Sequence, residues 1–527
     1  MSESYIPVEG QGKNLETAVF ENTAGDTVHR EGVFNGSPTN FDAKQEVDET
    51  PMAARVILYD IDGVPFSVAN PVPIGGTIDE VANVTSVDTV DTLTAITNNV
   101  NVVNVDPDNP DAQAGVTDQA PQGTEYGLVT RPIMPTDAFA RVRVSQPKTL
   151  FEATLQYGKY GTAYEEQITG SATSVHDPDS SCVNMTTTTA SGDKVIRQTT
   201  QYLQYQPGKS HYILQTFDPV SQIANNRKRI GYFDAANGPF LEISGTEIAF
   251  TLRSSTSGTV SDSNRVTQAN WSEDPLDGTG ASGITLDLTK SQILFFDLEW
   301  LGTGTVRAGF VIDGNFIHAH HFHWANENNL VFMTTPNLPL RWEIENTGVT
   351  AEAATLRHIC GSVMSEGGSD SVLAEPYSCN MGVTPKTVST RVPVLSIRPA
   401  LTFNSIVNRI GIKFDSADVL TETNDILVEI VHEGTLTGAS FSAVNATESG
   451  VEFDTAATAI SGGEVHSSFY IAAGSGKQAT TGTKDIFGYI PITLDIDGAN
   501  PKNLSIVCTG IGGNATVLAS MGWQEQR

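Results

Sequence analysis

Residues 306–323, VRAGFVIDGNFIHAHHFH, contain two runs of β-forming residues on either side of Asp313-Gly314. A type I′ turn of two residues needs positive φ at both central positions, and Asp-Gly is one of the dipeptides that tolerates this. The stretch therefore predicts a β-hairpin with strands at Val306–Asp313 and Asn315–His323.

Strand-like runs continue on both sides of this hairpin, separated by turn residues at intervals typical of a β-sandwich. They predict one sandwich domain at 133–380 and a second at 381–527. The other strands expected in the first domain are Phe139–Val144, Val195–Gln206, His211–Phe217, Glu247–Arg253, Gln292–Trp300 and Leu340–Glu345. Those of the second are Val392–Ile397, Ile406–Phe414, Asp425–His432, His466–Ala472, Phe487–Leu494, Ser505–Thr509 and Ala515–Met521. Two segments, Leu150–Tyr157 and Ile223–Arg229, are compatible with short helices.

The first 132 residues differ from the rest in composition and in the spacing of their apolar residues. Residues 1–52 are polar without a sustained period, which predicts an extended attachment arm. Residues 53–75 carry two β-type runs around Asp62-Gly63 and predict a small hairpin. Residues 106–132 are expected to form a linker that begins with Asp-Pro-Asp-Asn-Pro-Asp. Its carboxylates invite a calcium interpretation, but the twelve-residue calcium loop pattern is absent, so a solvated linker is favoured.

Residues 76–105 show an apolar period of three. An α-helix turns 3.6 residues per turn, so this stripe would drift around its axis, and in a strand it would alternate between faces. An extended thread with three residues per turn keeps the stripe on one side, and three such threads can bury it together. The segment therefore predicts a homotrimeric stalk, with a disordered linker as the alternative. The apolar positions are Ile78, Val81, Val84, Val87, Val90, Leu93 and Ile96.

The predicted fold is thus all-β, with tandem β-sandwich (jelly-roll-like) domains after an extended N-terminal arm and a thin trimeric stalk. Composition fits, because 39% of residues are hydrophobic, 47 are glycine, and strong helix formers such as Lys and Arg are scarce. Four cysteines lack any C-x-x-C spacing and are expected to be buried free thiols. They are Cys182, Cys360, Cys379 and Cys508.

The charge balance excludes several partners. Acidic residues number 61 and basic residues 30, and a net charge of −31 repels nucleic-acid phosphates and anionic lipid. No run reaches the ~18 apolar residues of a membrane span, and the N-terminus lacks the order of a signal peptide. We therefore expect a protein made in a cytoplasm, with neither nucleic acid nor membrane as a partner.

Several segments resemble structural proteins of tailed-phage particles. The resemblance is best in the middle third of the chain, and Ser67–Pro73 and Ala515–Trp523 are similar in style. The segments that carry it best are Arg197–Ser210, Gly231–Gly238, Phe250–Val260, Trp271, Leu276–Ile284, Asp297–Gly302, Met333–Pro339 and Arg341–Ile344. The resemblance transfers no catalytic residue.

The resemblance implies a non-enzymatic virion protein, assembled in the host cytoplasm. Together with the stalk it predicts a homotrimeric fibre or spike subunit. Its N-terminal arm would bind other virion proteins of the capsid, collar or tail, and its sandwiches would face outward, with a host-surface glycan as a further partner. The alternatives are a capsid decoration protein and a glycan-cleaving tailspike.

A histidine cluster at 318–323 is the densest group of potential metal ligands. On a regular strand His318 and His320 share one face, and His321 and His323 the other. Three chains meeting at an axis would bring six imidazoles together from one such pair, enough for an octahedral transition-metal ion. Strand histidines more often pack or form hydrogen bonds without metal, so no cofactor is expected, with a transition metal or calcium as the alternatives.

For two further patterns a structural interpretation is favoured over a functional one. Asp297 and Glu299 share a strand face, as glycoside hydrolysis requires, but a structural ion pair beside a strand that contains Arg307 is the preferred interpretation. Gly474-Ser-Gly-Lys477 lacks the first glycine of a phosphate loop and is expected to be a turn.

Five aromatic residues have rings of the kind that stack on sugars, but they are expected to be core residues. They are Tyr202, Tyr205, Tyr212, Trp324 and Trp342.

Overall fold

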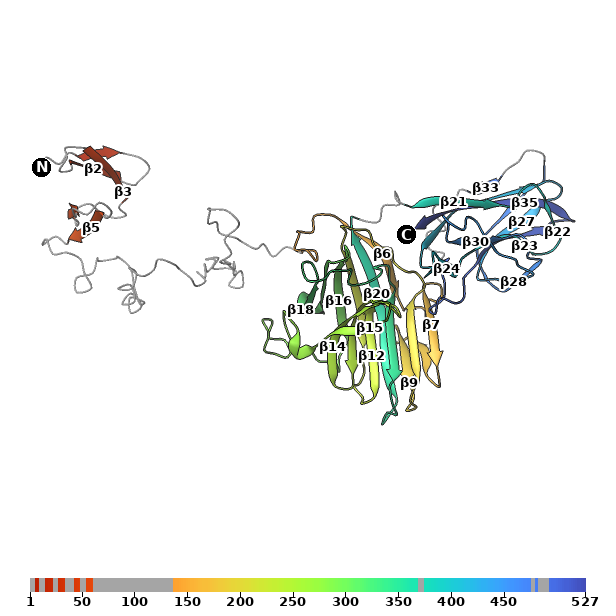
Figure 1. Ribbon diagram of the computed structural model, residues 1–527, viewed down its shortest axis with the longest axis horizontal. Helices are drawn as coiled ribbons and strands as arrows, with labels where there is room; N and C mark the ends of the chain where they lie inside the picture. Colours follow the sequence, from red (N-terminus) through yellow and green to blue (C-terminus); the bar gives the residue numbers. More distant parts are fainter. Residues whose placement is uncertain are drawn as a thin grey trace. The chain divides into compact units, whose positions relative to one another are not determined.

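The computed structural model describes residues 136–367, 374–474 and 492–527, together with the backbone of six further strands (Figure 1). Its contacts divide the chain into two units, residues 1–132 and 133–527, and each is taken by itself. Among the described residues, no helix is long and apolar enough to cross a membrane.

In the first unit the structure describes five strands. Strands β1 (Tyr5–Val8), β2 (Leu15–Glu21) and β3 (Thr27–Val33) form an antiparallel sheet, and β4 (Asp42–Val47) pairs with β5 (Ala54–Tyr59). The predicted stalk at 76–105, the linker at 106–132 and the turn at Asp62-Gly63 lie outside the described residues. The predicted domain bounds likewise stay predictions.

The second unit begins with a sandwich of two large antiparallel sheets. The seven-stranded sheet runs β15 (Ser261–Thr267), β14 (Glu247–Ser254), β13 (Gly238–Ser244), β12 (Asn226–Tyr232), β19 (Leu340–Asn346), β10 (Lys194–Thr199) and β7 (Tyr164–Thr169). The eight-stranded sheet runs β18 (Asn315–His323), β17 (Thr305–Ile312), β16 (Gln292–Glu299), β11 (His211–Asp218), β20 (Ala354–Glu366), β9 (Cys182–Thr187) and β8 (Thr173–Asp177), and β6 (Pro147–Thr154) pairs with β20. A 3-10 turn, η3 (Gln268–Asn270), follows β15.

A second sandwich follows from residue 375. Its five-stranded sheet runs β21 (Glu375–Asn380), β35 (Ala515–Gln526), β26 (Gly411–Thr421) and β33 (Ala479–Thr481), with β22 (Lys386–Val388) paired to β35. Its six-stranded sheet runs β29 (Ser442–Ala443), β30 (Val451–Asp454), β23 (Val392–Pro399), β34 (Leu504–Gly510), β27 (Ile426–His432) and β32 (Glu464–Ile471). Two small hairpins, β24 (Thr402–Phe403) with β25 (Ile406–Val407) and β28 (Thr435–Thr437) with β31 (Ala459–Ser461), complete it.

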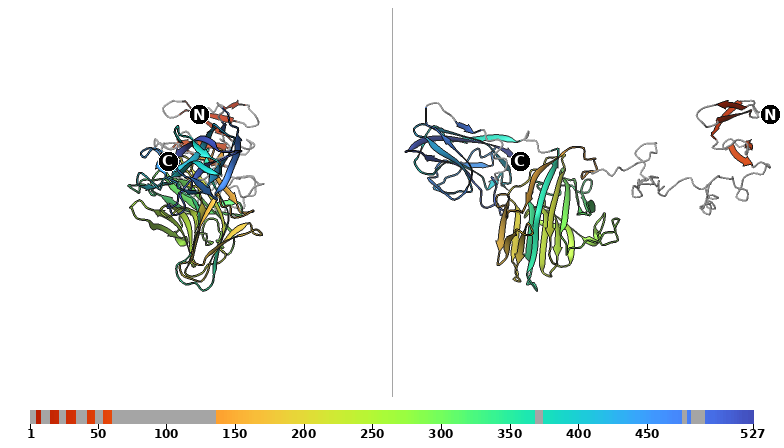
Figure 2. Two further views of the ribbon diagram at one scale, coloured as in Figure 1. Left: turned by 90° about the vertical axis from the view of Figure 1, so that its right-hand side faces the viewer. Right: turned by 180° about the vertical axis from the view of Figure 1, so that it is seen from behind.

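The all-β, sandwich fold class is confirmed, and side-chain alternation explains it. Along β35 every second residue from Ala515 is buried, so the strand presents one apolar face to the core. In the first sandwich Leu294, Phe296 and Leu298 of β16 point into the core that contains Trp342. The strands of this sandwich run side by side in the right-hand view of Figure 2.

The Asp313-Gly314 hairpin is confirmed. Its two central residues have φ of 51° and 77°, as a type I′ turn requires, and β17 pairs with β18 along their length. The helix predicted at Leu150–Tyr157 is wrong, because Phe151 and Ala153 are buried while Glu152 and Thr154 are exposed, which is the alternation of a strand.

Two other expected elements differ. The helix expected at Ile223–Arg229 is wrong, since Asn226–Tyr232 forms β12 in the middle of the seven-stranded sheet. Phe139–Val144 is not a strand either. This segment turns over the end of β16, where Arg141 and Arg143 form ion pairs with carboxylates of that strand.

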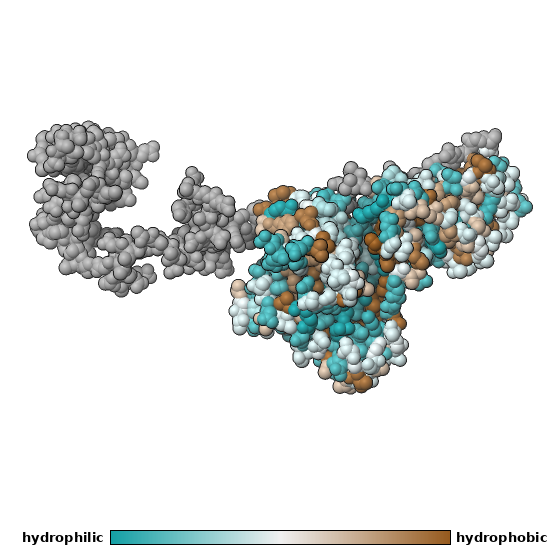
Figure 3. Space-filling view, in the orientation of Figure 1, coloured by the Kyte–Doolittle hydropathy of each residue, from teal (hydrophilic) through white to brown (hydrophobic). Residues whose placement is uncertain are grey.

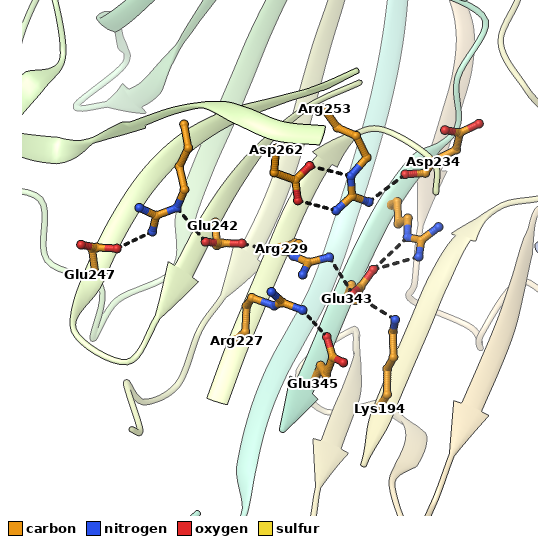
Figure 4. A network of polar contacts seen from close by, with 12 residues as sticks. Lys194, Arg227, Arg229, Asp234, Glu242, Glu247, Arg253, Asp262, Glu343 and Glu345 are labelled. Carbon is orange, nitrogen blue, oxygen red and sulfur yellow. Dashed lines mark hydrogen bonds and ion pairs between the residues drawn. The ribbon is translucent and has the colours of Figure 1, made fainter. Parts of the chain in front are cut away.

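The seven-stranded sheet turns a charged face away from the core. Positive and negative side chains alternate across its strands, and Arg229 of β12 lies between Glu242 of β13 and Glu343 of β19, at 3.3 and 3.1 Å (Figure 4). Arg253 forms two contacts with Asp262, at 2.8 and 2.9 Å. Because each buried charge has a partner of opposite sign, this face is stable without an apolar cover.

Candidate functional site

The aromatic residues named from the sequence do not form a binding platform. Tyr202, Tyr205, Trp324 and Trp342 are 3%, 7%, 6% and 0% exposed, and Tyr212 is half-buried. The interpretation of these four residues as core is confirmed. The cysteines are free, and all are buried except Cys360, which is half-buried.

Asp297 and Glu299 share a strand face, as predicted, but they do not line a cleft. Asp297 is 1% exposed, its Oδ1 lies 2.8 Å from Arg143 Nη2, and burial raises its pKa to about 6 despite that arginine. Glu299 is fully buried, and its Oε2 lies 3.0 Å from Arg141 Nη2. The pairing is structural, although the ion-pair partners come from residues 141–143 rather than from Arg307.

The predicted pairing of His318 with His320 on one face is wrong, whereas His321 and His323 lie close to each other as predicted, with ring centroids 5.8 Å apart. A β-bulge shifts the register of β18 at Ala319, so that His318 and His321 meet on the outer face with His318 Nδ1 and His321 Nε2 3.4 Å apart. His320 instead is 8% exposed and packs against Phe322, with the two ring centroids 4.4 Å apart. A pair of His318 and His320 therefore cannot bind one surface ion. The described residues contain no group of three or more His, Cys, Asp or Glu side chains that could hold a metal.

Two adjoining pockets in the second unit share Glu433 and Lys502, and we call them together the Glu433 groove. The first has a volume of about 490 Å³ and the second about 610 Å³. The first is lined by Gly161, Thr162, His432, Glu433, Gly463, Glu464 and Lys502. The second is lined by Arg398, Glu433, Gly434, Thr435, Leu436, Ala439, Phe441, Asp495, Asn500, Pro501, Lys502 and Asn503. The lining is mostly polar, and its apolar side chains are Leu436, Ala439, Phe441 and Pro501.

An ion-paired triad lies where the two pockets meet. Lys502 Nζ lies 2.7 Å from Glu433 Oε1 and 3.7 Å from Glu165 Oε2 of β7. Burial raises the pKa of Glu165 to about 7, and the charge of Lys502 only partly opposes it. Burial would also raise the pKa of Glu433, but the hydrogen bond from Lys502 outweighs this and lowers it. The groove thus holds an ammonium and a carboxylate ready to donate and accept hydrogen bonds.

The loop between β6 and β7 reaches this groove and exposes two tyrosines. Tyr157 is 93% and Tyr160 51% exposed, and Tyr160 directly precedes the lining residues Gly161 and Thr162. An exposed tyrosine presents an apolar ring face and a hydroxyl group to solvent, and both can contact a ligand. In Figure 3 the visible face of the second unit is a mosaic of hydrophilic and hydrophobic residues.

The part of this loop from Lys159 to Tyr164 is held by several polar contacts. The backbone N–H groups of Ala163 and Tyr164 both donate to Tyr160 O, at 3.0 Å. Lys159 O accepts a hydrogen bond from the buried Arg197, and Lys159 Nζ forms an ion pair with Glu166. A rigid loop that presents aromatic rings loses little conformational entropy when it binds a ligand.

Sequence reasoning missed this site. Glu165, Glu433 and Lys502 lie in three distant parts of the chain, and no short motif joins them. A local signal was present in Tyr157-Gly-Lys-Tyr160-Gly, because two tyrosines that are each followed by a glycine fit a turn better than a core strand. The predicted helix at Leu150–Tyr157 obscured it.

Comparison with known proteins gives no family. No family model and no curated protein matches the chain. Among solved structures, a protein of unknown function from Shewanella oneidensis matches at 8% identity and a TM-score of 0.29, covering 44% of this chain and 91% of that one.

Two further solved structures have known ligands or a binding role in their names. A lectin from Bauhinia forficata in complex with GalNAc matches at 10% identity and a TM-score of 0.26, over 42% of this chain and 100% of that one. The binding domain of botulinum neurotoxin serotype G matches at 10% identity and 0.26, over 48% and 57%. TM-scores below 0.5 carry no argument about function.

Proposed function

We propose that this chain is the outward, glycan-binding subunit of a tailed-phage particle and that it binds without cleaving. The observation that carries the binding role is the pair of exposed tyrosines, Tyr157 and Tyr160, on the β6–β7 loop, whose next residues Gly161 and Thr162 line the polar Glu433 groove. The virion role rests on the resemblance of the middle third of the chain to phage structural proteins.

The chemistry of the groove matches that of a sugar. A pyranose ring has apolar C–H faces that stack on aromatic rings, and hydroxyl groups that need both donors and acceptors. Tyr157 and Tyr160 offer the rings. Lys502 donates, Glu433 accepts, and Asn500 supplies an amide at the far end of the groove.

The charge of the groove favours a neutral or amino sugar. Glu433 and Glu464 line the first pocket together with Lys502 as its one lysine, and the whole chain carries a net charge of −31. Acidic polysaccharide would be repelled by this field at moderate ionic strength. Binding should therefore change little when salt is raised.

Binding fits the burial of Asp297 and Glu299 better than cleavage by these two carboxylates does. Glycoside hydrolysis needs two accessible carboxyl groups on opposite sides of the sugar. Asp297 and Glu299 are buried and paired with Arg143 and Arg141, which leaves neither free to reach a sugar. We therefore place the chain among adhesive subunits rather than glycan-cleaving tailspikes.

Assembly is the second part of the proposal. The three-residue apolar period at 76–105 favours a homotrimer, and the polar segment at 1–52 would attach the subunit to other virion proteins. A capsid decoration protein is the alternative, and it predicts a short or monomeric stalk with the same outward domains.

A glycan array probed with the full-length chain tests the binding role. Wild type should retain neutral or amino-sugar glycans, and Tyr157→Ala and Tyr160→Ala should each weaken binding roughly tenfold, since each removes a stacking ring. Tyr470→Ala is the matched control, because Tyr470 is 75% exposed on β32, at the opposite end of that strand from Glu464. Equal loss in all three variants, or no glycan bound by wild type, would overturn the proposal.

A further inference from the structure

The β17–β18 hairpin brings two histidines of its edge strand together. The bulge at Ala319 turns His318 and His321 to the same outer face, with His318 Nδ1 and His321 Nε2 3.4 Å apart. The His318 ring packs edge-on against Phe295, with centroids 5.1 Å apart, so its orientation is fixed. The side chain of His321 is 17% exposed, so solvent reaches the pair.

Glu273 sets the tautomer of His321. Its Oε1 lies 3.2 Å from His321 Nδ1, and its backbone N–H donates to Ala319 O at 3.1 Å, which ties it to β18. A carboxylate accepts hydrogen bonds and cannot donate them, so Nδ1 of the neutral His321 ring carries the proton. Nε2 of this ring then presents its lone pair to His318. A carboxylate behind a histidine in this way is the usual support of a metal-binding imidazole.

We propose that His318 Nδ1 and His321 Nε2 together bind a borderline transition-metal ion such as Zn²⁺, Ni²⁺ or Cu²⁺, with Glu273 orienting His321. Two nitrogen atoms 3.4 Å apart can both lie about 2.1 Å from one ion. In the free protein His318 Nδ1 carries the proton that joins the two rings, and on metal binding His318 would take its other neutral tautomer, with the proton on Nε2. Imidazole nitrogen suits these metals, whereas Ca²⁺ and Mg²⁺ prefer oxygen.

The surroundings of His318 and His321 favour metal binding of moderate affinity. A metal binds the neutral form of imidazole, and burial of the two rings among the residues of the sheet disfavours the charged form. Arg307 lies opposite His321 in the strand register, and its charge opposes a cation. Water completes the coordination, because the described residues bring no third ligand to these two histidines.

The neighbouring histidines provide an internal control. His323 forms a contact with Thr305 Oγ1 at 3.2 Å, and its ring centroid lies 5.8 Å from that of His321. It therefore belongs to the same cluster but contributes no nitrogen to the pair. His320 is buried, with Nδ1 accepting from the backbone N–H of Ser272, and is unsuitable for replacement.

Titration of the full-length, chelator-stripped chain with ZnCl₂ tests this site. Calorimetry should show one ion per chain, and His318→Ala and His321→Ala should each weaken binding at least tenfold. Glu273→Gln should weaken it about tenfold, as loss of a supporting carboxylate does. His323→Gln should bind as wild type, and CoCl₂ should give the visible absorption of nitrogen-bound Co²⁺ that excess ZnCl₂ removes.

Three results would contradict this proposal. They are the absence of a stoichiometric ion in wild type, retention of binding in both His318→Ala and His321→Ala, and loss in His323→Gln to the same degree. Far-ultraviolet circular dichroism on each variant shows whether it is folded, so a loss caused by unfolding is recognised. None of these outcomes depends on glycan binding.

Discussion

Glu343 shows how single residues stabilise the charged face of the first sandwich. Its side chain is 1% exposed, and its two oxygens lie 3.1 Å from Arg229 Nη1, 3.3 Å from Lys194 Nζ and 2.8 Å from Arg341 Nη2 (Figure 4). Burial alone would raise the pKa of this carboxyl, but the three cations outweigh it and hold the pKa at about 2.

Replacing Glu343 with Gln is therefore expected to lower the free energy of unfolding by about 3–5 kcal/mol, because it leaves buried arginines without their counter-charge. Chemical denaturation of the full-length chain measures this. Glu247→Gln is the matched control: Glu247 belongs to the same network but is 56% exposed, and its loss should cost at most about 1 kcal/mol. A small effect at Glu343 would show that the network contributes little.

The same carboxyl gives stability a pH dependence. The unfolded chain protonates Glu near pH 4.3, whereas folded Glu343 stays ionised to about pH 2. Its contribution is therefore complete above about pH 5 and is lost as the pH falls toward 2. The acid branch of a stability–pH profile should accordingly be shallower in Glu343→Gln than in wild type.

At the scale of elements, the β17–β18 hairpin depends on a glycine. A Cβ on Gly309 would lie 2.0 Å from Ile317 O and 2.8 Å from the Phe295 ring, so no side chain fits opposite the bulge. The turn glycine, Gly314, has open space around it and needs only its positive φ of 77°.

Gly309→Ala should therefore destabilise the first sandwich by about 2 kcal/mol or more, through the backbone clash. Gly314→Ala should cost about 1 kcal/mol, because only left-handed backbone strain opposes it. Thermal unfolding of the full-length variants compares them. If Gly314→Ala proves the more costly change, the bulge is not the constraint that the structure indicates.

These elements also show what the sequence predicts well and where it is insufficient. Runs of β-forming residues located β11, β14, β16 and β18 closely, although only β11 alternates between buried and half-buried residues and β14 and β16 are buried on both faces. The bulge in β18 was not predictable, since nothing in His318-Ala-His-His-Phe-His323 marks an extra residue. The bulge lies opposite Ala308 and Gly309 of the neighbouring strand, and it brings His318 to His321 instead of His320.

At the scale of the whole molecule, the sequence does not predict which segments far apart in the chain come into contact. The Glu433 groove depends on contacts between a loop near residue 160 and segments near 433 and 502, which only the folded chain brings together. The sandwiches were predictable because each strand carries its own pattern. The predicted stalk lies outside the described residues, so it stays a prediction.

Light scattering on the purified full-length chain tests the stalk. A trimer would have about three times the 56.2 kDa of one chain, and deletion of residues 76–105 should reduce the mass to that of a monomer. A control deletion of residues 106–132, the predicted linker, should leave the trimer intact. A monomeric full-length chain would contradict the trimer, and a trimer that survives deletion of 76–105 would place the threefold contact elsewhere.

Adhesion of the labelled full-length chain to intact bacterial cells, measured across a panel of strains, tests the central claim most directly. Wild type should bind cells of a susceptible strain saturably and with little dependence on salt. The double variant Tyr157→Ala/Tyr160→Ala should bind at least tenfold more weakly, while Tyr470→Ala should bind as wild type. Failure of wild type to bind any strain, or undiminished binding by the double variant, would contradict a glycan-binding role for the Glu433 groove.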